Sequence, residues 1–132
     1  MTFTEFCQKH DITATVKRTP KNPHMQDSEK DMFNYLVTLH FSDKKMTVHF
    51  STGKGWKSQP VASDVLSCLV FDAQTVESRE SFEESFEEWC HELGYDPDSR
   101  KAEATYNTIK RQTVELIIFL GATYAEAREC EE

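Results

Sequence analysis

The clearest pattern in the chain is a pair of alternating segments in its first half. In residues 34–41 (NYLVTLHF) and 45–51 (KMTVHFS), apolar and polar side chains alternate with the two-residue period of a half-buried β-strand. The segment SDKK between them is typical of a hairpin turn. Placing Phe41 opposite Met46 gathers the large apolar side chains on one face: Tyr35, Val37, Leu39, Phe41, Met46, Val48 and Phe50. The pattern predicts a hairpin covered on that face only, because a one-residue slip would expose the whole apolar set.

A third strand and a short helix are predicted upstream of the hairpin. Residues 12–18 (ITATVKR) alternate and are rich in β-branched side chains, which favours a strand. Before them, Thr2 and Glu5 have the spacing of a capping box, which predicts a helix with Phe3 and Phe6 on one face. Residues 19–31 hold two prolines and many turn-forming residues, so we expect a loop there.

The second half of the chain changes to the period of helices. Capping residues and glycines divide it into four expected helices. The first covers residues 63–73 with Ser63 as N-cap, and the second covers residues 81–94, with Ser81 and Glu84 as a capping box and Gly94 as the stop. A long helix follows from Asp98 or Ser99 to Gly121, and a short last helix begins at Thr123. We expect the tail, residues 129–132, to fray.

Together these elements predict an α+β fold with a three-stranded antiparallel sheet and four to five helices packed on one face. A chain of 132 residues is typical of a single domain, here 1–132, with a β-containing front (residues 1–60) and an acidic helical back (residues 61–132). Nine Phe, four Tyr and two Trp indicate a packed core rather than a disordered chain.

Charge divides unevenly between the two halves. The net charge is −8, but residues 1–60 hold nine Lys/Arg against six Asp/Glu, and residues 61–132 hold six against seventeen. Phosphate contacts need Lys and Arg, so the acidic half argues against a general nucleic-acid binder. A basic partner protein is a better match for such a surface.

The acidic residues gather around the predicted helix at residues 81–94. Its apolar stripe consists of Phe82, Phe86, Trp89 and Leu93, and the remaining surface carries Glu80, Glu83, Glu84, Glu87 and Glu88. Like charges three or four residues apart disfavour a helix by a few tenths of a kcal/mol per pair. Two interpretations stay open. The surface is either simply solvated, or it is a contact surface for a basic protein that normally binds nucleic acid. In the second case the carboxylates take the place of the phosphates.

Trp56 is the other candidate contact residue, because exposed Trp is enriched at binding hot spots. Lys54 and Lys57 make its loop locally basic, so we expect two charged surfaces of opposite sign. The loop STGKGWKS lacks the G-x-x-x-x-G-K-[ST] spacing of a phosphate-binding loop, which argues against a nucleotide site.

Catalysis is weakly indicated. His40 and His49 would lie diagonally across the hairpin on its polar face, where they are candidates for an acid–base pair or a ligand site. No nucleophile motif accompanies them. Polar surface is the simpler interpretation, and we expect no enzyme activity and no cofactor.

A metal site is weakly indicated as well. Cys7 and His10 stand at i and i+3, and Cys90 adjoins His91, but neighbouring helical residues point about 100° apart and cannot easily share a metal. The chain has no CxxC or HxxxH pair. The four cysteines are irregularly spaced, which favours free thiols.

The start, MTFTEFCQKHD, has no apolar segment after a basic patch, and no apolar run approaches eighteen residues. Neither a secretory signal nor a membrane span is therefore predicted. Together with the free thiols, this leads us to expect a protein of the cytoplasm.

Three stretches carry a family resemblance: MTVHFSTGKG, VASDVLSCLVFDA and ELGYDPDSRKAEATY. As a set they resemble a group of small proteins widely encoded in phages and prophages. That group shares a strand hairpin, a short glycine loop, a helix rich in Ala and Leu, and a GYD-x-DSR-KAE turn into a long helix. The resemblance spans roughly residues 30–121 and carries no catalytic motif. The group pattern has His where this chain has Trp56, so no shared histidine chemistry is implied there.

The resemblance implies a phage context and a bacterial host cell. Small acidic phage proteins often bind one host protein, as inhibitors of CRISPR systems and restriction enzymes do. We therefore expect a non-enzymatic, anti-CRISPR-like inhibitor that binds a basic host-defence protein through the acidic helix, without direct contact to nucleic acid or membrane. One alternative is a structural or regulatory phage protein that forms a homodimer or binds another phage protein. A small enzyme using His40 and His49 is the third.

Overall fold

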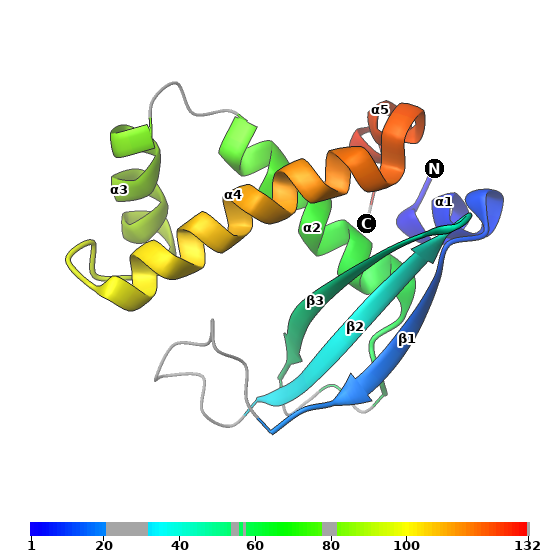
Figure 1. Ribbon diagram of the computed structural model, residues 1–132, viewed down its shortest axis with the longest axis horizontal. Helices are drawn as coiled ribbons and strands as arrows, with labels where there is room; N and C mark the ends of the chain where they lie inside the picture. Colours follow the sequence, from blue (N-terminus) through cyan, green and yellow to red (C-terminus); the bar gives the residue numbers. More distant parts are fainter. Residues whose placement is uncertain (21–31, 54–55, 57, 78–81, 132) are drawn as a thin grey trace.

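The computed structural model describes residues 1–20, 32–53, 56, 58–77 and 82–131 of the chain. The elements follow in the order α1 (Phe3–His10), β1 (Thr13–Arg18), β2 (Phe33–Phe41), β3 (Lys44–Thr52), α2 (Ala62–Glu77), α3 (Phe82–Leu93), α4 (Arg100–Leu120), the 3-10 turn η2 (Gly121–Thr123) and α5 (Tyr124–Arg128) (Figure 1). The predicted α+β fold, a three-stranded antiparallel sheet with helices packed against it, is confirmed. The predicted loop at residues 19–31 lies outside the described residues from position 21 onward.

The sheet is an antiparallel meander with the strand order β1-β2-β3. Its inner face carries the buried side chains of Tyr35, Val37, Leu39, Met46 and Val48. They form one core with α1, α2, α5 and the second half of α4. The outer face is polar, and the hydroxyl groups of Thr38 and Thr47 lie 2.9 Å apart there. The sheet is thus covered on one face, as the alternation predicted.

The register of the hairpin differs from the prediction by two residues. Leu39 lies opposite Met46 and Val37 opposite Val48, whereas the alternation suggested Phe41 opposite Met46. The strands are joined by a turn of only two residues, and Ser42 adopts a left-handed conformation with φ 58°. A shift of two residues keeps every side chain on its own face, so alternation alone could not separate the two registers.

The helix α2 begins one residue earlier than predicted, and Ser63 does not cap it. Val61 precedes the helix, and its carbonyl accepts the N–H of Val65 at 3.3 Å. The N–H of Val61 in turn donates to Asp64 Oδ2 at 2.8 Å. Asp64 therefore supplies the side-chain half of a capping arrangement, because its carboxylate reaches back to the backbone just before the first turn.

The two ends of the chain lie together, which corrects the expectation that the tail frays. Thr2 and Glu131 form a parallel β-bridge. The N–H of Glu131 donates to the Met1 carbonyl at 2.9 Å, and the N–H of Phe3 donates to the Glu131 carbonyl at 3.2 Å. Residues 129–131 are held because α5 turns the chain back toward α1, a contact between segments far apart in the sequence. None of the described helices is both long and apolar enough to cross a membrane.

The predicted capping box of α1 is present in full. Thr2 Oγ1 accepts the N–H of Glu5 at 3.1 Å, and the Glu5 carboxylate accepts the N–H of Thr2 at 3.0 Å. We expect Thr2→Ala to lower the free energy of unfolding by about 1 kcal/mol, because one helical N–H loses its acceptor. Urea denaturation measures this, with Ser58→Ala, at an exposed position outside the helices and strands, as the control. A loss equal to that of the control would contradict the capping role.

Candidate functional site

The acidic helix α3 stands at the end of the molecule away from the sheet and packs against the first half of α4 (Figure 1). A small second core joins them, formed by the buried side chains of Trp89, Cys90, Ala102 and Tyr106. The ring centroids of Trp89 and Tyr106 lie 5.2 Å apart, and Phe86 packs at the edge of this core. No described residue of α3 belongs to the main core. The aromatic stripe therefore fixes α3 to α4, as its spacing predicted for Phe86 and Trp89.

The turn after α3 is tightly organised. Gly94 has φ 76°, and the N–H of Tyr95 donates to the Cys90 carbonyl at 2.9 Å, so the helix ends as predicted. Tyr95 then stacks on Trp89 with a centroid distance of 4.7 Å. Ser99, one of the two predicted starts of the long helix, caps α4 by accepting the N–H of Ala102 at 3.3 Å. These local bonds hold the turn residues in fixed positions.

The carboxylates of α3 and of this turn form the acidic surface, which we define as Glu87, Glu88, Glu92, Asp96 and Asp98, all of them exposed. Residues 82–98 hold seven Asp/Glu and no Lys or Arg. Asp96 also accepts the N–H of Asp98 at 2.9 Å. The sequence interpretation included Glu87 and Glu88 but missed the three others. The run of carboxylates without Lys or Arg, continuing past Gly94, was the signal for them.

The remaining predicted members of this surface fall where the structure gives no side-chain description. Glu80 lies outside the described residues, and so does the predicted cap Ser81. Glu83 and Glu84 lie on the first turn of α3, but their side chains are outside the described part, as are those of Phe82 and Leu93. Their contribution to the acidic surface stays a prediction.

Carboxylates of the acidic surface also affect the pKa of a buried thiol, that of Cys90. Burial raises the pKa of Cys90, and the carboxylates of Asp96 and Glu87 raise it further. Cys90 is fully buried in the second core and stays protonated at neutral pH. It therefore serves as a small residue of the second core.

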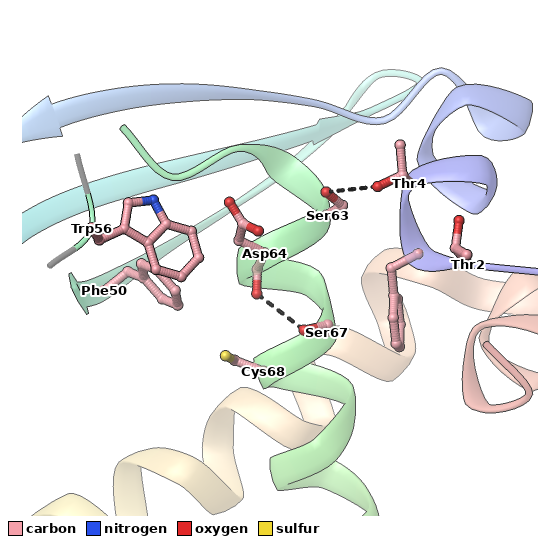
Figure 2. A pocket seen from close by; sticks show the side chains of 9 residues that line it. Thr2, Thr4, Phe50, Trp56, Ser63, Asp64, Ser67 and Cys68 are labelled. Carbon is pink, nitrogen blue, oxygen red and sulfur yellow. Dashed lines mark hydrogen bonds between the residues drawn. The ribbon is translucent and has the colours of Figure 1, made fainter. Parts of the chain in front are cut away.

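Trp56, the second predicted contact residue, lines a cavity of about 350 Å³ to which no described residue of α3 contributes. Trp56 is 42% exposed, and its backbone N–H donates to the Gly53 carbonyl at 3.0 Å. The lining comes from α1, the start of α2 and the end of β3, and consists of Thr2, Phe3, Thr4, Phe50, Trp56, Ser63, Asp64, Ser67 and Cys68 (Figure 2). Lys54 and Lys57, the predicted basic neighbours, lie outside the described residues.

Several polar groups that line this cavity are hydrogen-bonded to one another. The hydroxyl of Thr4 lies 3.4 Å from that of Ser63, which links α1 to α2, and Ser67 donates to the Asp64 carbonyl at 3.3 Å (Figure 2). The sequence interpretation did not group these residues with Trp56, because nothing in the local pattern brings residues 2–4, 50, 56 and 63–68 together. The cavity and the acidic surface share no residue, so they are separate candidate sites.

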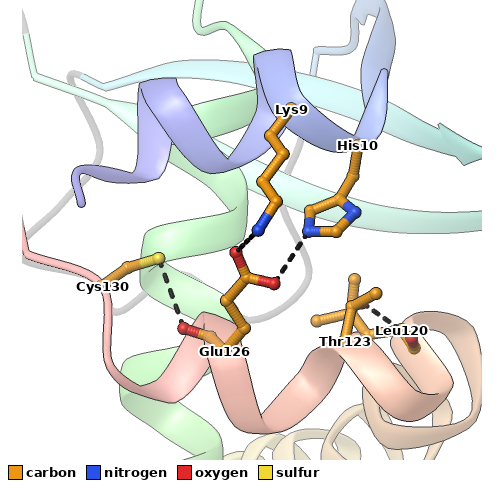
Figure 3. A network of polar contacts seen from close by, with 6 residues as sticks. All are labelled: Lys9, His10, Leu120, Thr123, Glu126 and Cys130. Carbon is orange, nitrogen blue, oxygen red and sulfur yellow. Dashed lines mark hydrogen bonds and ion pairs between the residues drawn. The ribbon is translucent and has the colours of Figure 1, made fainter.

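The α1 wall of the cavity is tied to α5 by a polar network. Lys9 Nζ donates to Glu126 Oε1 at 2.7 Å, and His10 Nε2 lies 3.0 Å from Glu126 Oε2 (Figure 3). These two hydrogen bonds hold the pKa of Glu126 below its usual value. The last helix α5 begins directly after Thr123, as predicted, and the Thr123 hydroxyl donates to the Leu120 carbonyl at 2.7 Å.

His40 and His49 do not form the predicted diagonal pair. In the observed register His40 faces Lys45 and His49 faces Leu36, so the two histidines are four positions apart along the ladder. At about 3.3 Å per residue this separates them by roughly 13 Å. His40 Nε2 lies 2.9 Å from the hydroxyl of Thr15 on β1. This separation along the strands is twice that of the predicted diagonal arrangement.

Metal binding finds no support in the described part of the chain, where no three His, Cys, Asp or Glu residues form a cluster that could hold an ion. All four cysteines are free, as predicted. Burial, with a contribution from Cys130, raises the pKa of Cys7 to about 11. Cys7 is thus a protonated residue of the main core.

No protein-family model matches the chain, and no curated protein or solved structure shows significant similarity to it.

Proposed function

We propose that this is a phage-encoded, non-enzymatic inhibitor that binds a basic component of a host-defence complex through its acidic surface, in the manner of an anti-CRISPR protein. One observation carries the proposal: the aromatic side of α3 is bound to α4, and the exposed side and the following turn present five carboxylates. The phage context and the defence target come from the sequence resemblance, and the acidic surface supplies the physical means of binding.

The charge pattern of α3 works against the stability of the helix. Glu83 and Glu87 stand four residues apart, as do Glu84 and Glu88, and each such like-charged pair disfavours a helix by a few tenths of a kcal/mol. The described contacts that pack α3 on α4 come from its aromatic side. A binding role accounts for the carboxylates, because a concentrated charge speeds and orients docking on a basic groove.

The best-matched partner surface is a groove that normally holds nucleic acid. Such a groove presents Lys and Arg to phosphates, and carboxylates at the surface of a rigid helix offer the same sign of charge. The binding is expected to weaken steeply with salt, because exposed charges separated by solvent are screened within about 8 Å at physiological ionic strength.

Self-association is a second candidate, favoured by a different surface. On α4, Val114 is 58% exposed and Ile118 is 67% exposed, and Ile117 is exposed as well. A structural or regulatory phage protein could use such a stripe to bind a copy of itself. Analytical ultracentrifugation separates the candidates, since the inhibitor proposal needs only a monomer.

The test compares wild type with a variant of the acidic surface, Glu87→Gln/Glu88→Gln/Glu92→Gln/Asp98→Asn, as bait in lysate from a host with active CRISPR and restriction systems. We call it the α3 variant. A matched control neutralises four exposed carboxylates elsewhere, in the variant Asp11→Asn/Asp43→Asn/Glu115→Gln/Glu129→Gln. The two variants have equal net charge, so any difference between them reports position rather than total charge.

We expect wild type and the control to capture one defence protein and the α3 variant to lose it. With the purified partner, the dissociation constant should rise about tenfold or more for the α3 variant and should rise with salt for wild type. Equal capture by all three baits would make α3 a solvated surface and overturn the proposal.

A further inference from the structure

The cavity beside Trp56 combines aromatic surface with a single charge. Phe3, Phe50 and Trp56 contribute the aromatic part of its lining. Among the nine described lining residues, Asp64 is the one that carries a charge. An aromatic face attracts a cation through the negative potential above its ring, and a carboxylate attracts the same cation directly. The lining therefore matches a ligand group that is both flat and positively charged.

Asp64 is held in position by the start of α2. Its Oδ2 accepts the N–H of Val61 at 2.8 Å, which fixes the side chain against the first turn. A carboxylate has about four acceptor positions, so this one bond leaves capacity for a ligand. Figure 2 shows the Asp64 carboxylate between the indole of Trp56 and the hydroxyl of Ser63. The charge thus stands beside the aromatic surface, on a helix that positions it before any ligand binds.

We propose that this cavity binds the guanidinium group of an arginine side chain that a partner protein inserts beside Trp56. The guanidinium stacks on the indole and donates to Asp64. Arginine fits better than lysine, because its planar group stacks on aromatic rings and presents several donors in a fixed arrangement. A volume of about 350 Å³ is at the lower end of the range for small-ligand pockets, about 300–1,000 Å³.

This site is separate from the acidic surface of α3, and the inference does not depend on the function proposed above. Lys54 and Lys57 flank Trp56 in the sequence and add local positive charge. Their charge opposes a cation, so a single arginine side chain should bind with a dissociation constant in the millimolar range, and the remaining affinity for a protein must come from other contacts.

The test is an NMR titration of the intact protein that follows the indole N–H of Trp56, assigned by comparison with Trp56→Phe. The probe is N-acetyl-L-arginine amide, which presents the side chain as a peptide does. The matched ligand control is N-acetyl-L-citrulline amide, which has nearly the same shape but no charge. We expect the arginine probe to shift the Trp56 signal and the citrulline probe to bind at least about tenfold more weakly.

Two variants test whether Asp64 is the carboxylate that binds the arginine probe. Asp64→Asn keeps an oxygen to accept the Val61 N–H but removes the negative charge, and it should weaken arginine binding about tenfold. Asp43→Asn removes one charge from the exposed hairpin turn and should leave binding unchanged. Binding of both probes with equal affinity, or an unaltered affinity in Asp64→Asn, would overturn the inference. So would tighter binding of free L-arginine than of the capped probe, which would assign the cavity to a metabolite. The comparison of probes on wild type decides the matter even if Asp64→Asn fails to fold.

Discussion

Replacing Trp89 with alanine is expected to release α3 from α4 while the sheet and the main core stay folded. Trp89 is 3% exposed and packs against Tyr95 and Tyr106, with ring centroids 4.7 and 5.2 Å away. Removal of a large buried aromatic side chain costs about 3–5 kcal/mol. The second core contains few other buried side chains, so a loss of this size should exceed the energy that holds α3 in place.

Hydrogen exchange measures the effect. Amides of α3 and of the first turns of α4 should exchange much faster in Trp89→Ala, and amides of β2 and β3 should keep their protection. Phe71→Ala is the matched control, because Phe71 is 64% exposed and its loss should change stability by less than about 0.5 kcal/mol. Unchanged protection of α3, or loss of protection throughout the chain, would show that the two cores are not separate. Under the proposed function, Trp89→Ala should also lose partner binding, because the carboxylates are no longer held in one arrangement.

The second large effect concerns Asp72 and pH. Asp72 lies on α2, and burial raises the pKa of its carboxyl from an ordinary 3.8 to about 6. The folded protein therefore holds this proton more tightly than the unfolded chain does, and its stability falls as pH rises from about 4 through 6. The difference between the two pKa values corresponds to roughly 3 kcal/mol at neutral pH. Asp72→Asn removes the charge and should recover a stabilisation of that order at pH 7.

Urea denaturation between pH 4 and pH 8 tests this expectation. The gain of Asp72→Asn over wild type should be small near pH 4, should grow through pH 6 and should then stay constant. Glu126 provides a contrast of opposite sign, since Lys9 and His10 lower its pKa. Its contribution is present above the unfolded pKa and is lost as pH falls, so Glu126→Gln should lose stability at pH 7 and match wild type in acid. A pH-independent gain in Asp72→Asn would show that burial of the charge is not its cause.

Much of the local structure could be predicted from neighbouring residues. The capping box of Thr2 and Glu5, the end of α3 at Gly94 and the end of α4 at Gly121 all depend on bonds within one turn. Strand alternation also predicted which face of the hairpin is buried, because each side chain's face depends only on its parity along the strand. For the candidate site, the aromatic spacing of Phe86 and Trp89 predicted the packed side of α3, and Glu87 and Glu88 were predicted members of its exposed side.

Other features depended on contacts that no local pattern contains. A two-residue turn set the hairpin register and separated His40 from His49, although the alternation suited either register equally. The bridge between Thr2 and Glu131 holds a tail that was expected to fray because it is a chain terminus. The cavity combines Thr2, Phe50, Trp56 and Asp64, whose positions in the chain give no sign that they meet.

The amino-acid sequence by itself thus determined the elements, their buried faces and the charge of α3, because each of these follows from interactions within a few residues. Only the tertiary structure decided the register, the closure of the two termini, the division into two cores and the placement of Asp64 beside Trp56. Those features arise from packing between distant segments, where many arrangements satisfy the same local preferences and the burial of apolar surface selects among them.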